Sequence, residues 1–332
     1  MTTTHLPLDD AYDLSLAALL ASGADQRNAQ AIARIIWRAE RDGAASHGLF
    51  RIPAYVETFK KGKANGDANP VITESDGAIL RMNADKGFTP LAHEVGLPAL
   101  ADAARKHGMA TLGISRVFHY AALWPEVEAL TDQGLVGMAF TCSPPYVAPH
   151  GGKRRMFGTN PMAFGWPRTG QHAMIFDQAS SHSARGEVMI MARDGHEAPL
   201  GAGVDVNGNP TTDPNEILKG AQSPFGAYKG AAIALMVDLL AGPLIGELTS
   251  LGIEEEDDGE GPALGGELII AFDPTRMGGS GAVEAGEALL KELEGEDGVR
   301  LPGARRAANR ANTARDGIDV PTSLYETIKG YI

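Results

Sequence analysis

The sequence predicts an α/β (α+β) chain in which helical segments at both ends flank a middle region built around a mostly antiparallel sheet. The first 65 residues carry helical periodicity, and from about residue 70 short β-like runs alternate with helical ones. Residues 141–225 are dense in Gly, Pro, Asn and Asp between short apolar runs, which is typical of antiparallel strands with long connections. At 332 residues the chain exceeds the usual size of one domain, so we expect two or three packed domains.

Three helices are expected in the first 65 residues. The first covers residues 8–22, is rich in Ala and Leu, and ends before a glycine. The second has Asp25 as its N-cap and ends at Gly43, and its apolar residues at positions 32, 35, 36 and 39 have the spacing of a buried stripe. The third covers residues 53–60.

Further along the chain, strands and helices alternate. Strands are expected at residues 77–82, 109–114, 135–140, 162–164, 174–176 and 268–272, and helices at residues 91–106, 121–132 and 230–242. The helix at 230–242 is apolar on nearly all sides and should be buried. The acidic run Glu254–Glu260 predicts a mobile, solvated loop, and two final helices begin near Pro302 and Pro321.

Composition and charge exclude several classes of protein. The formal net charge of −13 gives an average field that repels nucleic acid and anionic membranes, so we expect neither as a partner. No stretch approaches 18 uninterrupted apolar residues, and the N-terminus lacks the pattern of a signal peptide. The single cysteine, Cys142, cannot form an intrachain disulfide, which fits a cytoplasmic protein. An anionic ligand would have to be held by local cations that work against this overall charge.

The common signatures of nucleotide and metal sites are absent from the sequence. The nearest matches to the G-x-G-x-x-G fingerprint, at residues 201–203 and 279–281, both lack the third glycine in position. There is no Walker A motif, no H-E-x-x-H motif and no pair of C-x-x-C motifs. The nine histidines are scattered, so we expect no catalytic metal.

The first candidate site is the run Ser46-His47-Gly48 with Arg51. If the segment is helical from Ser46 onward, His47 and Arg51 lie one turn apart on one face. An imidazole that exchanges a proton and a guanidinium that grips a carboxylate are what the reduction of a 2-oxo or 2-imino acid requires. The alternative is a helix cap followed by a surface histidine and arginine.

Four other segments are candidates for ligand contacts. His119 lies at a strand-to-helix junction that could face a pyrophosphate, although a lone histidine among aromatic residues more often belongs to the core. Lys229 opens the apolar helix, where a cation opposes the helix dipole unless an anion lies nearby. The basic residues at 305–310 and 153–155 suit a 2′-phosphate, or else form a solvated helix face. The polar segments 157–161, 177–181 and 184–187 are each compatible with ordinary loops, and Glu187 is a candidate to orient His47.

Seven segments taken together resemble the malate/L-lactate dehydrogenase-like superfamily of NAD(P)H-dependent oxidoreductases, which lacks the Rossmann fold. In chain order they are SHGLFRIPAY, HYAALWPEVE, APHGGKRRMFGTNPMAF, FDQASSHSARGEV, DVNGNPTTDP, SPFGAYKGAAIALMVDLLAG and RLPGARRAANRA. Within the superfamily the chain is most similar to the Δ1-piperideine-2-carboxylate/Δ1-pyrroline-2-carboxylate reductases. That similarity rests on the HYAALWP run and on the acidic Glu187, where malate and lactate enzymes usually carry Lys.

The resemblance implies a fold and a domain organisation. NADPH would lie on a mostly antiparallel, non-Rossmann sheet domain, the N- and C-terminal helices would pack together, and two chains would form a homodimer. The implied division is a helical domain of residues 1–70 and 300–332, a joining α/β segment of residues 71–135, and an NADPH-binding sheet domain of residues 136–299.

The resemblance also implies roles for individual residues. Ser46, His47 and Glu187 would form a relay in which His47 donates the proton, and Arg51 and Thr159 would bind the substrate carboxylate. The cofactor, NADPH or alternatively NADH, would contact His119, Tyr120, Ala121, Ala122, Leu123, Asp177, Gln178, Ala179, Arg185, Gly186, Tyr228, Lys229, Gly303, Arg305 and Arg306.

Two positions depart from the family pattern. Glu187 stands where this subfamily usually has Asp, which lengthens the relay by a methylene. Arg116 and Val117 stand where the family usually has Asn and Ser. A valine side chain cannot form a hydrogen bond, so that contact would be lost, although Arg116 would offer a phosphate partner.

The leading interpretation is a cytoplasmic enzyme that uses NADPH to reduce a cyclic imino acid, Δ1-pyrroline-2-carboxylate or Δ1-piperideine-2-carboxylate, to L-proline or L-pipecolate. The alternative is a 2-hydroxy-acid dehydrogenase of the same fold that acts on malate, lactate or ureidoglycolate. Glu187 favours the imine, because a negative charge tolerates a cationic iminium. A catalytically inactive cofactor-binding or scaffold protein is a third interpretation, and the presence of Ser46, His47, Arg51 and Thr159 argues against it.

Overall fold

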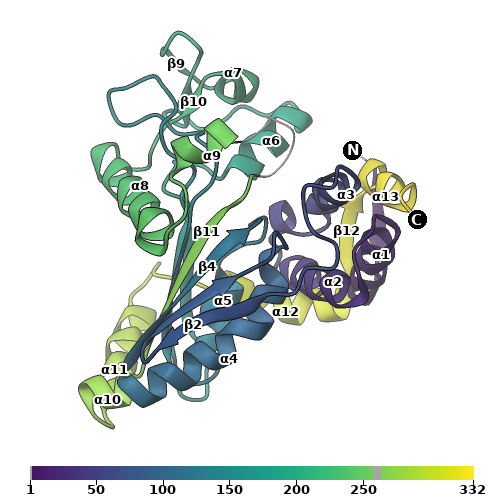
Figure 1. The fold of residues 1–332 in the computed structure, drawn as a ribbon. Helices are drawn as coiled ribbons and strands as arrows, with labels where there is room; N and C mark the ends of the chain where they lie inside the picture. The colour runs from purple at the N-terminus through teal and green to yellow at the C-terminus, as the bar shows by residue number, and fades with distance from the viewer. Residues whose placement is uncertain (1, 257–262) are drawn as a thin grey trace.

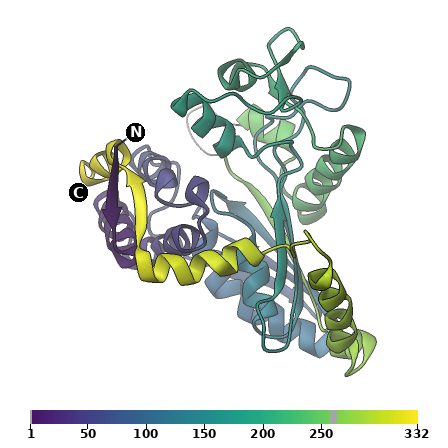
Figure 2. The ribbon, with the colours of Figure 1, turned by 180° about the vertical axis from the view of Figure 1, so that it is seen from behind.

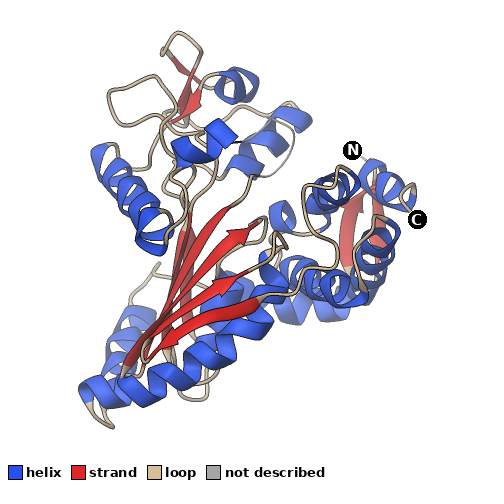
Figure 3. Ribbon diagram, viewed as in Figure 1, coloured by secondary structure: helices blue, strands red, loops and turns tan. Residues whose placement is uncertain are grey.

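The structure is a computed structural model that describes residues 2–256 and 263–332. A long twisted sheet forms its centre, a helical part built from both chain ends lies on one side, and a smaller part with α6 to α9 lies at one end of the sheet (Figures 1 and 3). The mixed α/β prediction is confirmed. Residues 257–260 of the predicted acidic loop lie outside the described residues, and Glu254 and Glu255 belong to a helix instead.

The helical part combines the two ends of the chain. Its elements are α1 (Leu8–Ala21), α2 (Gln26–Arg41), α3 (Ile52–Lys60), α12 (Ala304–Asp316) and α13 (Thr322–Lys329), with β1 (Thr3–Leu6) paired antiparallel to β12 (Ile318–Pro321). Asp25 caps α2, because its side chain accepts the Asn28 N–H at 2.8 Å. Ile32 and Ile36 of the predicted stripe are fully buried in a core shared with Ile318 and Ile328. The N- and C-terminal segments therefore pack together, as the resemblance implied.

The central sheet has seven strands in the order β2-β3-β4-β11-β5-β6-β7. Its strands are β2 (Val71–Asp76), β3 (Ile79–Asn83), β4 (Met109–Val117), β5 (Val136–Thr141), β6 (Met162–Trp166), β7 (Met174–Gln178) and β11 (Gly265–Phe272). Only the β3–β4 pair is parallel, so the sheet is mostly antiparallel, as predicted. The proposed division between residues 135 and 136 falls inside this sheet, because β4 and β5 both pair with β11.

Helices cover both faces of the sheet. α4 (Thr89–His107) and α5 (Trp124–Thr131) pack on one face, where Leu112 and Ile269 are buried, and α8 (Tyr228–Ala241) packs on the other against Leu268. Neighbouring residues 268 and 269 thus serve opposite faces, as strand geometry requires. The smaller part adds α6 (Arg185–Asp194), α7 (Pro214–Lys219), α9 (Ser250–Glu256), β8 (Gly203–Val204), β9 (Pro210–Thr211) and β10 (Ala221–Gln222). Several elements were not predicted from the sequence, namely β1, β2, β12, the short strands β8 to β10, α6, α7, α9, α10 (Pro274–Gly278) and α11 (Ala282–Gly295).

The predicted burial of the helix at 230–242, which corresponds to α8, holds for one face only. Leu235 and Leu239 are about half exposed, at 48% and 51%, while Val237 is fully buried. Residues Tyr228–Ile245 are long and apolar enough to span a membrane, with a mean hydropathy of 1.5 over 18 residues. Asp238 in this segment is nevertheless buried and accepts hydrogen bonds from Asn160 and Ser250, so one face of the helix packs against protein.

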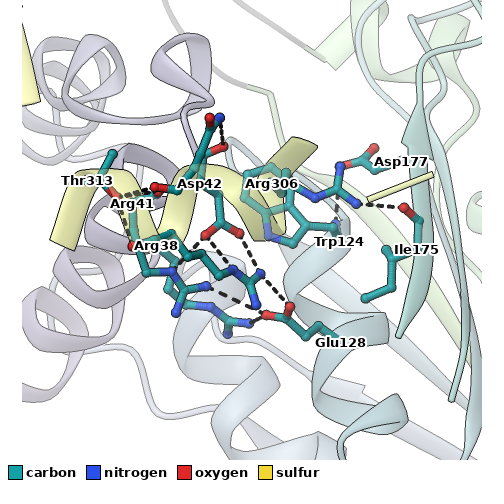
Figure 4. Close-up of polar contacts among 11 residues, drawn as sticks. Arg38, Arg41, Asp42, Trp124, Glu128, Ile175, Asp177, Arg306 and Thr313 are labelled. Carbon is teal, nitrogen blue, oxygen red and sulfur yellow. Dashed lines mark hydrogen bonds and ion pairs between the residues drawn. The ribbon is translucent and has the colours of Figure 1, made fainter. Parts of the chain in front are cut away.

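Helix α12 runs from the helical part to the sheet (Figure 2). Its Arg310 belongs to an ion-pair network around the buried Asp42. The Asp42 carboxylate, whose side chain is fully buried, accepts from Arg310 at 2.8 and 2.7 Å and from Arg41 at 2.7 Å. Arg38 and Arg310 both bind Glu128 of α5 (Figure 4). Burial raises the pKa of Asp42, but the hydrogen bonds from Arg310 and Arg41 outweigh this and hold it below its ordinary value. The network thus joins α2, α5 and α12.

Removal of the Asp42 charge should destabilise the fold. We expect Asp42→Asn to lower the free energy of unfolding by about 3 kcal/mol at neutral pH, because it leaves buried arginines without their carboxylate. Since the folded-state pKa of Asp42 is depressed, this contribution is present above about pH 4 and is lost as the pH falls through the folded-state value. Denaturant titrations of both proteins at neutral pH and at about pH 3 measure the difference.

The exposed Arg315–Asp316 pair at the end of the same helix supplies the control. Asp316→Asn should not measurably change the stability, because exposed ion pairs contribute little. A neutral-pH stability of Asp42→Asn equal to that of the unmodified protein would show that the network does not hold these elements together.

Candidate functional site

The chain between α2 and α3 forms two short 3-10 turns, η1 (Ala45–His47) and η2 (Leu49–Arg51), in place of the continuous helix that the sequence suggested. Gly48 separates them with an extended ψ of −139°, and a Cβ added there would overlap the carboxylate of Glu40. That carboxylate accepts the Leu49 N–H at 2.7 Å. Burial raises the pKa of Glu40 to about 7, against the lowering effect of this hydrogen bond. The end of α2 therefore fixes both turns.

The two turns direct His47 and Arg51 to the wall of one cavity of about 670 Å³. Arg51 donates from Nε to the Ser46 carbonyl at 2.8 Å, and the Ser46 hydroxyl lies 3.1 Å from His47 Nδ1. The Arg51 guanidinium also lies over the ring of Tyr120, 5.6 Å from its centroid. These contacts leave the outer edge of the guanidinium facing the cavity, so the structure brings Ser46, His47 and Arg51 together as predicted.

The electrostatics of His47 are unusual for a histidine. Burial, with further effects from Arg51 and His119, lowers its pKa to about 3. Burial also lowers the pKa of Arg51, but a guanidinium stays protonated in proteins. In the free protein at neutral pH, a neutral imidazole thus stands beside a cation. An anion bound by Arg51 would offset one of the effects that keep His47 unprotonated.

Other predicted residues complete the cavity wall. His119, Tyr120, Ala121, Thr159 and Arg185 all line it. The Arg185 guanidinium lies 4.3 Å from the ring centroid of Tyr146, and its Nη1 is buried without a hydrogen-bond partner among the described residues. A Cβ added to Gly186 would lie 3.0 Å from Arg51 Nη2, so the start of α6 packs directly against the η1–η2 segment. Arg51, Arg185 and Arg193 all line the cavity and make its wall suitable for a bound anion.

Not all of the predicted residues line this cavity, and Glu187, Tyr228 and Lys229 are among those that do not. Glu187 is exposed, and its carboxylate accepts the Ala184 N–H at 3.4 Å, which caps α6. Within the described residues no hydrogen bond joins Glu187 to Ser46 or His47. Tyr228 and Lys229 are exposed at the first turn of α8. The relay through Glu187 and the cofactor contacts at 228 and 229 remain predictions.

A second cavity of about 640 Å³ lies between β7 and the start of α12. Gly303 lines it with a φ of +89°, and a Cβ there would lie 3.1 Å from the Ile175 carbonyl. Arg306 donates to that same carbonyl at 2.7 Å and lies over the ring of Trp124 (Figure 4). Arg305 and Gln178 are exposed, whereas Ala179 is half-buried.

Asp177 links this region to the first cavity. Its carboxylate accepts the backbone N–H groups of Leu123 and Trp124 at 2.8 and 3.1 Å, at the start of α5. Burial raises the pKa of Asp177 to about 6, although the Leu123 N–H lowers it. Ala122 and Leu123 are buried beside it. In this structure Asp177 holds the loop that carries His119, which places the predicted 119–123 and 177–179 segments side by side.

A buried group of charged side chains, not predicted from the sequence, lies behind His119. His93 of α4 lies with Nε2 2.6 Å from Glu267 of β11 and with Nδ1 3.4 Å from Glu126 of α5. Burial lowers the pKa of His93, but Glu267 and Glu126 outweigh this and raise it to about 9. His93 therefore carries a proton, and with these two glutamates it forms the cluster that we call the His93 cluster.

Side-chain atoms of this cluster lie within 4.8 Å of one another, close enough to share a metal ion. His93, however, turns a different nitrogen to each carboxylate. That arrangement is typical of an imidazolium bridging two carboxylates, whereas a metal ligand directs one nitrogen to the ion. The geometry favours an ion-paired cluster.

Two tyrosines at the cavity were also missed. Tyr55 is fully buried, its hydroxyl has no hydrogen-bond partner within the described residues, and its ring packs against Tyr120 at 5.5 Å. Tyr146 lies beneath Arg185. Tyr55 follows Arg51 by four residues, a spacing that places both on one side of a helix and was available in the sequence. Tyr146 gave no comparable local signal.

The arrangement fits a long anionic ligand such as a nicotinamide dinucleotide. Arg185 offers a buried donor without a partner among the described residues, and Gly303 leaves space where a side chain would crowd the backbone of β7. Asp177 binds the backbone of Leu123 and Trp124, and Arg306 lies over the Trp124 ring (Figure 4). Val117, by contrast, lines the cavity without a polar side chain, and exposed Arg116 uses its backbone N–H to bind Glu247 at 2.9 Å.

Comparisons with known proteins agree with this geometry. A Δ1-pyrroline-2-carboxylate/Δ1-piperideine-2-carboxylate reductase from Pseudomonas aeruginosa is 44% identical over 328 residues, which cover 98% of each chain. A Δ1-pyrroline-2-carboxylate reductase from Ancylobacter novellus is 43% identical over 329 residues, covering 98% of this chain and 96% of its own.

Among solved structures, the Δ1-piperideine-2-carboxylate reductase from Pseudomonas syringae pv. tomato superposes with a TM-score of 0.93 at 38% identity. The match covers 99% of this chain and 100% of that one. The family model for malate/L-lactate dehydrogenase matches residues 6–329. The chain therefore belongs to the malate/L-lactate dehydrogenase family.

Proposed function

We propose that this chain is a NADPH-dependent reductase of cyclic imino acids, which converts Δ1-pyrroline-2-carboxylate or Δ1-piperideine-2-carboxylate to L-proline or L-pipecolate. The observation that carries the proposal is the convergence of His47 and Arg51 on one cavity. The names of relatives that are more than 40% identical over nearly the whole chain support the same substrate class. The reaction requires a hydride at C2 and a proton at the ring nitrogen.

When bound, the reduced nicotinamide supplies the hydride. The residues placed to hold the cofactor are Arg185, the loop of residues 119–123, Asp177 and the start of α12 with Gly303 and Arg306. Arg306 suits a 2′-phosphate, which favours NADPH over NADH in this proposal. The exposed Arg305, Tyr228 and Lys229 would complete these contacts from the rim.

Arg51 and Thr159 bind the substrate carboxylate in this mechanism. The guanidinium of Arg51 is already oriented by the Ser46 carbonyl and by the ring of Tyr120, so little conformational freedom is lost on binding. Thr159 lines the same cavity and brings a hydroxyl donor. Two such contacts fix both the position and the plane of a small acid.

His47 transfers the proton to the ring nitrogen. Its imidazole is neutral in the free protein, because burial and Arg51 keep its pKa low. A substrate carboxylate on Arg51 offsets that positive charge and so allows His47 to hold a proton when the substrate is present. The Ser46 hydroxyl, 3.1 Å from Nδ1, orients the ring, and Glu187 would reach this pair only by leaving its capping position on α6.

A 2-hydroxy-acid dehydrogenase of the same fold is the less supported alternative. The same pair of side chains would serve a 2-oxo acid, since a ketone also needs a carboxylate anchor and a proton donor. The relatives named above all take cyclic imines, which favours the imine. We also propose that the protein acts in the cytoplasm as a homodimer, in which a second copy would cover the exposed leucines of α8.

The proposed role of His47 as proton donor is tested by its replacement. Purified protein should oxidise NADPH in the presence of Δ1-pyrroline-2-carboxylate, and His47→Ala should lower kcat at least about a hundredfold with little change in thermal stability. Absorbance of NADPH measures the rate, and a parallel panel with pyruvate and oxaloacetate tests the alternative. His196→Ala, at an exposed position far along the chain, is the matched control and should keep full activity. Full activity of His47→Ala would refute the assigned role.

Two substitutions of Arg51 separate the effect of its charge from that of its shape. Arg51→Lys keeps the charge but loses the two-pronged contact, so KM for the imine should rise about tenfold with a smaller change in kcat. Arg51→Met also removes the charge, so KM should rise further and the pKa of His47 should increase. Steady-state kinetics and an NMR titration of His47 measure these effects. An unchanged KM in Arg51→Met would place the substrate carboxylate elsewhere.

A further inference from the structure

The cavity wall lacks a counter-charge for the proposed substrate. A protonated cyclic imine carries a carboxylate and a positive ring nitrogen. Arg51 and Arg185 suit the carboxylate, but among the described residues that line the cavity none is Asp or Glu. Glu187, the acid that the sequence suggested for this purpose, is exposed and caps α6. A negative charge that stabilises the ring nitrogen must therefore come from residues behind the cavity wall.

The His93 cluster supplies such a charge. It contains two carboxylates and one imidazolium, and its side chains are almost fully buried, at 8% exposure for His93, 1% for Glu126 and 0% for Glu267. With both carboxylates ionised, its net charge is −1. Because the cluster is buried, this charge is screened less than a charge at the surface.

His119 connects the cluster to the cavity. Its Nε2 lies 3.6 Å from Glu126 and 3.8 Å from Glu267, and the side chain also lines the cavity. Nε2 has no hydrogen-bond partner within the described residues, and neither do one oxygen of Glu126 and one of Glu267. His119 Nε2 therefore lies close to both carboxylates of the cluster without a hydrogen bond to either. The negative charge lies one side chain away from the ligand.

Several other charged groups stand near His119. On the cavity side are the neutral His47 and the cation Arg51, which the substrate carboxylate would neutralise. Arg185 and Arg193 also line the cavity; Arg185 is assigned to the cofactor in the proposed mechanism, and Arg193 pairs with Asp194. Behind the wall, Arg38 acts on His93, and Asp177 adds a further acid near Glu126. With the cavity cations paired in this way, the carboxylates of the cluster are the negative charges behind His119.

We propose that the His93 cluster is a specificity determinant, whose net negative charge behind His119 favours ligands with a positively charged ring nitrogen over uncharged ones. The inference rests on the proposed function and deepens it, because it assigns the choice between a cyclic iminium and a 2-oxo acid to Glu126 and Glu267. At an effective dielectric constant of about 20, one charge several ångströms away changes affinity by about tenfold or more.

Two ligands that differ in the charge of the ring nitrogen test the proposal. L-proline carries a ring ammonium, whereas pyrrole-2-carboxylate has the same ring size and carboxylate but an uncharged nitrogen. Neither reacts with NADPH, so binding to the protein–NADPH complex is measured by nicotinamide fluorescence or calorimetry. Glu126→Gln should weaken L-proline about tenfold and leave pyrrole-2-carboxylate within about twofold.

Glu128→Gln is the matched control, since it removes a carboxylate from the same helix that binds Arg38 and Arg310 away from the cavity. It should lower stability without changing the ratio of the two affinities. If Glu126→Gln fails to fold, Glu267→Gln replaces it and is judged by the same ratio. Retained binding of pyrrole-2-carboxylate shows that the site of the variant is intact.

The outcomes separate the two proposals. If the unmodified protein binds neither ligand, the proposed function is wrong and this inference falls with it. If it binds both, and the Gln variants weaken both equally or neither, the inference alone is overturned. Metal analysis of the purified protein gives an independent check, because a divalent ion held by the His93 cluster would neutralise its two carboxylates and overturn the inference.

Discussion

The buried carboxylate of Asp42 is the interaction on which the site depends. His47 and Arg51 come from the helical part of the chain, whereas His119, Thr159 and Arg185 come from the sheet and the smaller part. A cavity between them exists only while these parts keep their relative position. Asp42 fixes that position, because it accepts from Arg41 of α2 and from Arg310 of α12, and Arg310 also reaches Glu128 of α5. A fully desolvated carboxylate between two guanidiniums allows little displacement of either helix.

Local sequence predicted those parts of the site whose residues are close in the chain. His47 and Arg51 were proposed because their spacing is short, and the structure places both on one cavity although the segment forms two 3-10 turns. The His93 cluster could not be found this way, since His93, Glu126 and Glu267 come from two helices and a strand that only the folded sheet brings together. Glu126 even lies inside the recognised HYAALWPEVE segment, but nothing local marks it as buried.

Other differences between expectation and structure have similar causes. α8 was predicted to be buried because it is apolar on nearly all sides, but composition does not say which face another element covers. Glu187 was expected at His47 because of its position in a motif. The first turn of α6 offers unpaired backbone N–H groups, however, and its carboxylate binds there. Long-range pairing in the sheet likewise placed residues 71–135 and 136–178 in one layer, where the sequence had suggested a boundary.

The acidic composition of the chain and the anionic ligands of its proposed function are compatible because the charges that matter are buried. Surface carboxylates are screened by salt within about 10 Å, whereas Arg51, Arg185 and Arg306 stand in partly desolvated positions that lower the pKa of each. These arginines make the ligand-binding walls positive inside a protein of net charge −13. A wall that was only positive would repel an iminium, so the same low-dielectric setting that strengthens the arginines also gives the His93 cluster its effect. The fold is shared with enzymes of different chemistry, and it is this pairing of charges within it that selects the ligand.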